Sequence, residues 1–257
     1  MIDPRADVAP GAVLGEGVQI GPWSVIGPDV RIGARTRIDA HVVLHGPTTL
    51  GEDNHIHAFA CIGGDPQDKK HRGEGESRLE VGSRNVIREY TTINRGSAAG
   101  GGVTRIGDDN WILGYVHIAH DCQVGSHTVF ANNATLAGHV TVEDHAILGG
   151  FAGVHQFCRI GAYAFCAIAT VVVKDVPPFF TVAGNTARAR GLNREGMRRN
   201  QFPASTLEQL RRAYRVLCRM NLTLPEALLQ LAPLAEVSPE VARLRHFVAN
   251  SIRGVVR

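Results

Sequence analysis

The chain has 257 residues and a net charge of +3, with 27 basic side chains against 24 acidic ones. This near balance argues against nucleic acid as a partner, and a chain of this length can bury a core without disulfide or metal staples. The five scattered cysteines, the lack of a signal-peptide pattern and the lack of an apolar run near ~20 residues favour a cytoplasmic protein with no membrane span.

Aliphatic residues recur at every sixth position along most of the chain. They stand at Val8, Leu14, Ile20, Ile26, Ile32, Ile38, Leu44, Leu50, Ile56 and Ile62, then at Val81, Ile87 and Ile93, and again at each sixth position from Ile106 to Val172. In the later part, a small or β-branched residue stands two positions before each of them. Two inward positions separated by an outward one is strand alternation, and a hexad period is typical of a parallel β-helix. Glycine often follows the aliphatic residue, where we expect turns with unusual backbone angles and close approach.

This pattern resembles that of the hexapeptide-repeat acyltransferases. The resemblance implies a left-handed prism with three hexads, or about 18 residues, in each coil. On these columns Cys122, Cys158 and Cys166 point inward, so we interpret them as small core residues and not as nucleophiles.

Two segments interrupt the repeat. Residues 63–80 are polar and charged, and residues 94–105 are rich in glycine. Insertions in a solenoid project outward as loops, often on a binding face, so we expect both loops to border the functional site.

The strongest local signal for chemistry is the string HIAHDC at residues 117–122. Stacking by one coil places His120 beneath Gly138, which lies beneath Gln156, and Asp121 beneath His139. A histidine is the usual general base near neutral pH, and a carboxylate can orient it. A glycine one coil away can offer its backbone N–H to an oxyanion, so these parts suit direct acyl transfer from a thioester to a hydroxyl.

Beyond residues 177–178 the β period ends and helical signals begin. Ser205–Glu208 and Thr223–Glu226 read as capping boxes, and Ser238 before Pro239 reads as a helix start. We therefore predict an all-β left-handed parallel β-helix, a hexapeptide-repeat prism, over residues 1–188. A small α-helical C-terminal domain over residues 189–257 follows it.

Several strings together resemble the UDP-N-acetylglucosamine O-acyltransferase family. They are HIAHDC (117–122), ANNATLAGHV (131–140), VHQF (154–157), DVPP (175–178) and GN (184–185), and the match spans the chain. The resemblance implies transfer of an (R)-3-hydroxyacyl group from acyl carrier protein to the 3-hydroxyl of UDP-N-acetylglucosamine, the first step of lipid A synthesis. It also implies a homotrimer, with no cofactor and no metal site.

The resemblance assigns roles to individual residues. His120 is the base, Asp121 orients it and the Gly138 amide stabilises the oxyanion. The residues that match substrate-binding positions are His117, His139, His155 and Gln156, with Asp68 and Lys70 on the sugar and acyl side, Asn193 and Glu195 at the uracil and Arg199 at a phosphate.

Two positions depart from the family pattern, and a third bears on chain length. Asn200 replaces a basic residue after Arg199, and Thr186 replaces a histidine that is common after Gly184-Asn185. Ile168 matches a position where glycine opens the acyl groove and a bulkier side chain closes it. We therefore expect a medium-length donor of ~10–12 carbons, since a pocket floor can discriminate by ~1–3 kcal/mol per methylene. An isoleucine packed at a subunit interface is the alternative.

Other functions share the repeat. A γ-class carbonic anhydrase would use histidines as zinc ligands, but His117 and His120, three apart on one strand, are expected to point to opposite faces. An acetyl-CoA-dependent acetyltransferase fits the helical tail and the His-Asp string less well. The N-acyltransferase that acts later in lipid A synthesis has an extra amino-terminal domain, whereas hexads begin here by Val8. A purely structural solenoid leaves the outward histidines unexplained.

Overall fold

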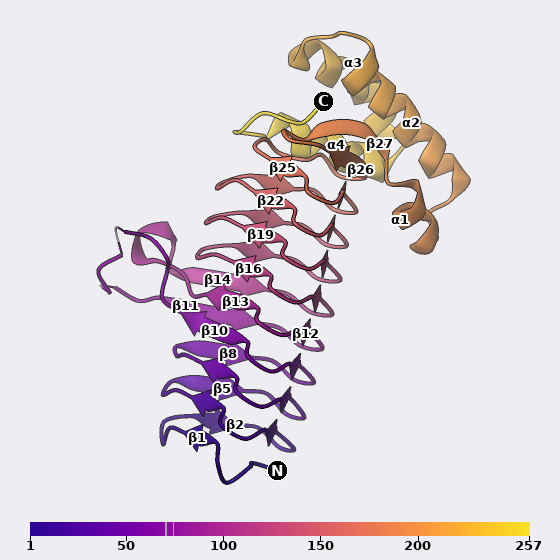
Figure 1. Ribbon diagram of the computed structural model, residues 1–257. Helices are drawn as coiled ribbons and strands as arrows, with labels where there is room; N and C mark the ends of the chain where they lie inside the picture. Colours follow the sequence, from indigo (N-terminus) through magenta and orange to yellow (C-terminus); the bar gives the residue numbers. More distant parts are fainter. Residues whose placement is uncertain (70, 74) are drawn as a thin grey trace.

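The computed structural model describes residues 1–69, 71–73 and 75–257. Short strands wind into a left-handed β-helix, and α2–α4 gather at its carboxyl-terminal end, far from the amino terminus (Figure 1). The predicted fold class is confirmed. Among the helices of the described residues, none has the length and apolar character that crossing a membrane requires.

The strands form three sheets, one along each side of the prism. The first sheet holds β1 (Asp7–Val8), β4 (Val25–Ile26), β7 (Val43–Leu44), β10 (Cys61–Gly64), β13 (Thr92–Asn94), β16 (His117–Ile118), β19 (Thr135–Leu136), β22 (Gly153–Val154) and β25 (Val171–Val172). The second holds β2 (Val13–Leu14), β5 (Val30–Ile32), β8 (Thr48–Leu50), β11 (Arg78–Val81), β14 (Val103–Ile106), β17 (Gln123–Val124), β20 (Thr141–Val142) and β23 (Arg159–Ile160). The third holds β3 (Gln19–Ile20), β6 (Arg37–Ile38), β9 (His55–Ile56), β12 (Val86–Ile87), β15 (Trp111–Ile112), β18 (Val129–Phe130), β21 (Ile147–Leu148), β24 (Phe165–Cys166), β26 (Phe180–Ala183) and β27 (Arg188–Leu192).

The register follows the hexad count. Ile118 pairs with Leu136, and Leu136 with Val154, so each coil advances three hexads. The named strand pairs are parallel except β26 with β27, which is antiparallel. The predicted domain boundary between residues 188 and 189 falls at the beginning of β27. The division of the chain into two domains at that point stays a prediction.

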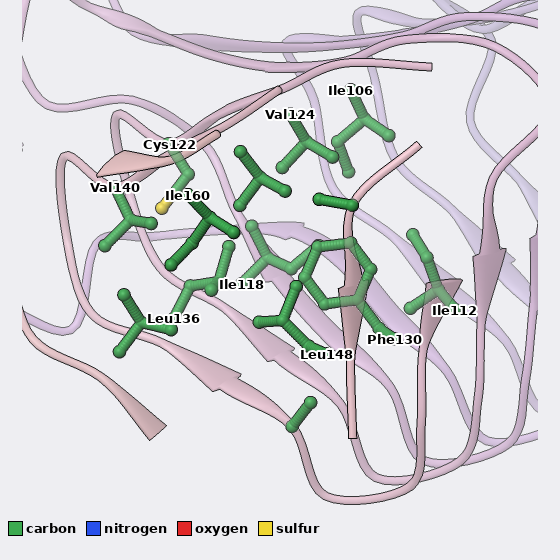
Figure 2. Packing of buried hydrophobic residues seen from close by; sticks show 14 of the residues in the cluster. Ile106, Ile112, Ile118, Cys122, Val124, Phe130, Leu136, Val140, Leu148 and Ile160 are labelled. Carbon is green, nitrogen blue, oxygen red and sulfur yellow. The ribbon is translucent and has the colours of Figure 1, made fainter. Parts of the chain in front are cut away.

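The hexad columns form the core. Figure 2 shows Phe130 and Leu148 of the third sheet packed toward Ile118 and Leu136 of the first and Val124 of the second. Burial of each such side chain stabilises the fold by ~1.5–3 kcal/mol. Cys122, Cys158 and Cys166 are fully buried, as predicted, and burial raises the pKa of the Cys122 and Cys166 thiols to about 12.

A ladder of buried polar side chains runs through the same interior. The Asn54 side-chain oxygen accepts hydrogen bonds from the Asn85 backbone and amide, at 2.9 and 3.0 Å. Asn85 accepts in turn from the Asn110 N–H at 3.0 Å, and Asn110 from the Thr128 N–H at 2.8 Å. Each side-chain oxygen therefore accepts a hydrogen bond from a backbone N–H of the next coil, while Asn110 Nδ2 has no hydrogen-bond partner among the described residues.

The turns correct one expectation about glycine. Gly15 and Gly21 do not have positive φ angles, and a Cβ on them would lie 2.6 and 2.7 Å from backbone nitrogens of the next coil. Close approach therefore explains them. The left-handed conformation falls instead on non-glycine corner residues, among them Tyr115, Asp121 and His139 with φ of 63°, 61° and 62°.

Both interruptions are outward excursions, but they are shorter than the predicted loops. β10 ends at Gly64 and β11 begins at Arg78, while β13 ends at Asn94 and β14 begins at Val103. The excursions are therefore residues 65–77 and 95–102, called here the first and second inserted segments. The second contains the 3-10 helix Ala98–Gly100.

Four helices follow the prism: α1 (Arg194–Arg199), α2 (Ala204–Arg219), α3 (Leu224–Glu236) and α4 (Pro239–Ala249). The capping box at Thr223 and the N-cap at Ser238 are confirmed. The capping box predicted at Ser205 is wrong, because α2 already begins at Ala204 and Pro203 occupies the cap position. Pro203 has an extended backbone, with φ −59° and ψ 150°, and the helix begins directly after it. Ser205 therefore lies within the first turn of α2.

Candidate active site

The HIAHDC string lies at the edge between the first and second sheets. β16 ends at Ile118, and residues 119–122 turn the chain into β17. The left-handed angle at Asp121 makes this corner, and the Asp121 N–H donates to Thr104 Oγ1 at 2.8 Å. The turn therefore presents two adjacent polar side chains on a fixed backbone.

His120 and Asp121 form a hydrogen-bonded pair. His120 Nδ1 lies 2.8 Å from Asp121 Oδ2, and their side chains are 13% and 1% exposed. A carboxylate at this distance accepts a hydrogen bond from the Nδ1–H group, so Nε2 carries a free lone pair. That arrangement suits a general base whose second nitrogen reaches the ligand.

The second inserted segment holds the carboxylate in place. Ser97 donates twice, from its Oγ to Asp121 Oδ2 at 2.6 Å and from its N–H to Oδ1 at 3.0 Å. Burial opposes ionisation of Asp121, but the hydrogen bonds from Ser97 and His120 outweigh it and lower the pKa of the carboxyl group. Asp121 is therefore an anion at neutral pH.

Gly138 lies against the histidine from the next coil. A Cβ at this position would stand 2.7 Å from His120 Cε1 and 2.8 Å from Nε2, so only glycine leaves room for the ring. Within the described residues, the Gly138 N–H has no backbone or side-chain acceptor. It can therefore donate to a ligand beside His120 Nε2.

His139 completes this cluster. Its Nε2 is 3.8 Å from Asp121 Oδ2, and its ring meets that of His120 edge-on at 5.2 Å. His139 also stacks on Phe157 at 4.5 Å, which fixes its ring plane. The donor atoms of His120, Asp121 and His139 lie within 4.8 Å of one another, so these three side chains could also hold a metal ion.

His117 lies close enough to His120 for the charge of His120 to act on it. The strand ends at Ile118, so His120 already belongs to the turn. His117 Nδ1 bonds to Thr92 Oγ1 at 2.8 Å. Burial and then the charge of His120 lower the pKa of His117, which makes it a neutral hydrogen-bonding group at neutral pH.

His155 and Gln156 lie one coil higher, as the count predicts. The Phe157 N–H donates to the Gly138 carbonyl at 3.2 Å, which places Gln156 above Gly138. His155 Nδ1 is 3.2 Å from an Arg253 guanidinium nitrogen. Both side chains are exposed and accessible to a ligand.

Other predicted residues lie away from this cluster within one chain. Figure 1 shows α1 and the inserted segments on opposite sides of the prism. The Asn193 side chain caps α1, accepting from the Gly196 N–H and donating to the Tyr163 carbonyl, each at 2.9 Å. Glu195 pairs with Arg198 and Arg199, and these hydrogen bonds lower its pKa to about 2.

Three further predicted residues are Asp68 and Lys70 in the first inserted segment and Ile168 at the acyl end. Asp68 is exposed in that segment and its carbonyl accepts from the His71 N–H at 2.9 Å, while Lys70 lies outside the described residues. Ile168 is 72% exposed in the turn between β24 and β25, at the edge between the third and first sheets. Ile168 and His120 therefore lie at opposite edges of the first sheet.

Sequence reasoning missed the residues that position Asp121 and His117. Ser97, Thr104 and Thr92 fix Asp121 and His117 through hydroxyl groups. Gly100 passes so close to the Asp121 carboxylate that a side chain there would overlap it. The glycine-rich composition of the second inserted segment signalled a close approach, but it did not say to which residue.

Comparisons with known proteins agree along the whole chain. Residues 175–256 match the family model described as UDP-N-acetylglucosamine O-acyltransferase, domain 2, and residues 29–64 and 104–138 match bacterial transferase hexapeptide repeats. The acyl-[acyl-carrier-protein]–UDP-N-acetylglucosamine O-acyltransferases of Thiobacillus denitrificans and Verminephrobacter eiseniae are 55% and 52% identical, with 100% of this chain and 99% of each relative covered. The crystal structure of Francisella novicida UDP-N-acetylglucosamine acyltransferase superposes with a TM-score of 0.98 at 38% identity, covering 100% of this chain and 94% of that one.

Proposed function

Since the chain belongs to the UDP-N-acetylglucosamine O-acyltransferase family, we propose that it transfers an (R)-3-hydroxyacyl group from acyl carrier protein to the 3-hydroxyl of UDP-N-acetylglucosamine. The chain is an acyltransferase of lipid A biosynthesis. The names of its relatives give both substrates, acyl carrier protein and the sugar nucleotide. We place the reaction in the cytoplasm.

The observation that carries the mechanism is the His120–Asp121 pair beside Gly138. His120 Nε2 takes the proton of the sugar hydroxyl as its oxygen attacks the thioester carbonyl. The tetrahedral oxyanion accepts a hydrogen bond from the Gly138 N–H. Collapse breaks the carbon–sulfur bond, and the imidazolium returns its proton to the leaving thiolate.

The electrostatics support these roles. Asp121 remains ionised because its pKa is lowered, so it stabilises the imidazolium that forms in the transition state. The thiols of Cys122 and Cys166 are buried with strongly raised pKa, which argues against a cysteine acyl-enzyme. Direct attack by the sugar hydroxyl on the thioester needs neither of these thiols.

We also propose a homotrimer with active sites between prisms. Within one chain, α1 with Asn193, Glu195 and Arg199 is on the side of the prism away from the second inserted segment that holds Asp121 (Figure 1). A uracil and phosphate site on α1 can serve the His120 cluster only when a neighbouring chain supplies one of the two parts. His117, His139, His155, Gln156 and the first inserted segment then bind the sugar and the acyl chain.

Ile168 sets the donor length in this proposal, at ~10–12 carbons. Its side chain is 72% exposed on an outward turn, where it can meet the end of a bound acyl chain. A groove floor of this kind discriminates by ~1–3 kcal/mol per methylene.

The test is a transfer assay with purified protein. UDP-N-acetylglucosamine is offered with a series of (R)-3-hydroxyacyl carrier proteins and, separately, with acetyl-CoA. We expect product from a medium-chain carrier-protein donor, and a shift to longer donors with Ile168→Gly. Product from acetyl-CoA alone would contradict the proposed function. An unchanged chain-length preference in Ile168→Gly would contradict the role of Ile168 in setting donor length, while leaving the function intact.

A further inference from the structure

A second group of side chains that could hold a metal ion lies beside the third sheet, away from the His120 turn. Asp39 directly follows β6, and His55 and His57 belong to the next coil, at and after β9. Asp39 Oδ2 is 3.1 Å from His55 Nε2 and 3.3 Å from His57 Nδ1. We propose that Asp39, His55 and His57 bind a divalent transition-metal cation of the Zn²⁺ class.

The spacing of the donor atoms fits such an ion. Ligands at ~2.0–2.1 Å from a tetrahedral zinc ion lie about 3.3 Å from one another. The two distances from Asp39 Oδ2 are close to this value, and all three donor atoms lie within 4.8 Å of one another. Two histidines and one carboxylate also form a donor set that zinc uses with further positions open.

The β-strand fixes the two histidines. His55 and His57 are separated by one residue, so their side chains leave the sheet on the same face. Their rings stack with centroids 3.9 Å apart, which holds Nε2 of one and Nδ1 of the other toward the same carboxylate oxygen. Little rearrangement is needed for an ion to enter between them.

The surrounding charges orient the ligands. Arg37 Nε donates to Asp39 Oδ1 at 2.9 Å, which leaves Oδ2 facing the histidines. Glu89 is the nearest further carboxylate, with Oε1 3.8 Å from His57 Nδ1, and Arg88 binds both of its oxygens. The three ligand side chains are 20–31% exposed, so the site is open to solvent and to ions.

The ion would tie neighbouring coils together. β6 pairs with β9 and β9 with β12, so Asp39, the two histidines and Glu89 come from three successive coils. An ion that binds the folded chain and not the unfolded one stabilises the fold. The site lies on another sheet from His120, so this role does not depend on the proposed function.

The test is metal binding by tag-free protein freed of metal with a chelator. CoCl₂ is titrated and followed by its visible absorption, ZnCl₂ is titrated by calorimetry, and Tm is measured with and without each ion. Three variants are compared: His57→Ala, Asp39→Asn, which keeps the side-chain shape, and His41→Ala, whose ring stacks between Trp23 and Phe59 outside the group. His139→Ala reports on the donor set at the active site.

We expect one ion per chain, a rise in Tm with Zn²⁺, and an affinity at least tenfold weaker in His57→Ala and Asp39→Asn, whose metal-free circular dichroism matches that of the wild type. His41→Ala and His139→Ala should bind as the wild type does. Absence of binding, unchanged binding in both ligand variants, or loss of the one-to-one binding in His139→Ala would overturn the proposal.

Discussion

Individual hydrogen bonds determine the ionisation state of the Asp121 carboxylate. Ser97 supplies two of the bonds to Asp121, from a segment that is not part of the repeat. The pKa of Asp121 is lowered in the folded chain, so its contribution to stability is present above the ordinary carboxyl pKa of 3.8 and is lost as pH falls through the folded value.

We therefore expect Ser97→Ala to lower the free energy of unfolding by ~1.5–3 kcal/mol at pH 7, because it removes a hydrogen bond to a buried anion. The loss should shrink in acid, where Asp121 is protonated in both proteins. Urea unfolding at pH 7 and at a series of pH values falling below 3.8 measures this. Ser97→Thr keeps the hydroxyl, and equal losses in the two variants would contradict the assignment.

Glycine at position 138 makes room for the His120 ring. In Gly138→Ala the new Cβ would lie 2.7–2.8 Å from ring atoms, so the ring must move off its position. We expect kcat to fall by ~10–100-fold, as misplacement of a catalytic group by about 1 Å can cost. Gly153→Ala, where no atom lies within 4 Å of the new Cβ, is the matched control. Equal activity in the two variants would show that the ring is not confined as described.

The site shows what sequence could and could not reveal at this scale. Coil stacking placed Gly138 above His120 and His139 beside Asp121, because hydrogen bonding between coils fixes the register. It could not place Ser97, because an inserted segment follows no repeat and its path depends on contacts with the finished prism. The same holds for His117, whose relation to His120 depends on where the strand ends.

At the scale of elements, the helix caps separate two similar strings. Thr223 and Glu226 form a capping box, with the Thr223 N–H 2.8 Å from a Glu226 carboxylate oxygen. Ser205, in contrast, is exposed and is the second residue of α2. We expect Thr223→Ala to lower the free energy of unfolding by ~1 kcal/mol and Ser205→Ala to change it by less than ~0.5 kcal/mol. Thermal unfolding of both variants checks this, and the reverse order would contradict the cap assignment.

The reason for the Ser205 error is local. Both strings have the spacing of a capping box, and a sequence pattern cannot tell which residue takes the extended cap conformation. Pro203 already has that conformation, so the helix begins immediately after it. The inserted segments were placed correctly in order, yet β11 and β14 extend into them because four-residue pairing between these strands continues the second sheet.

For the whole molecule, the hexad period was sufficient to predict a parallel β-helix, because every coil must bury the same columns, whereas its left hand was predicted from the family resemblance. It carried no information on how many chains pack together. The proposed trimer predicts a molar mass near three times 27.7 kDa by light scattering, unchanged across protein concentration. A mass of one chain would contradict sites shared between prisms, since α1 and the His120 turn would then lie apart.

If His120 is the base for direct acyl transfer, His120→Ala must slow the transfer step itself, which single-turnover transfer measures. His127→Ala is the matched control, since His127 lies on another edge of the prism and stacks on His145. With the preferred donor, we predict a transfer rate lower by ~10²–10⁴-fold in His120→Ala and a wild-type rate in His127→Ala, both variants being folded. A rate within a few-fold of the wild type in His120→Ala would contradict the account.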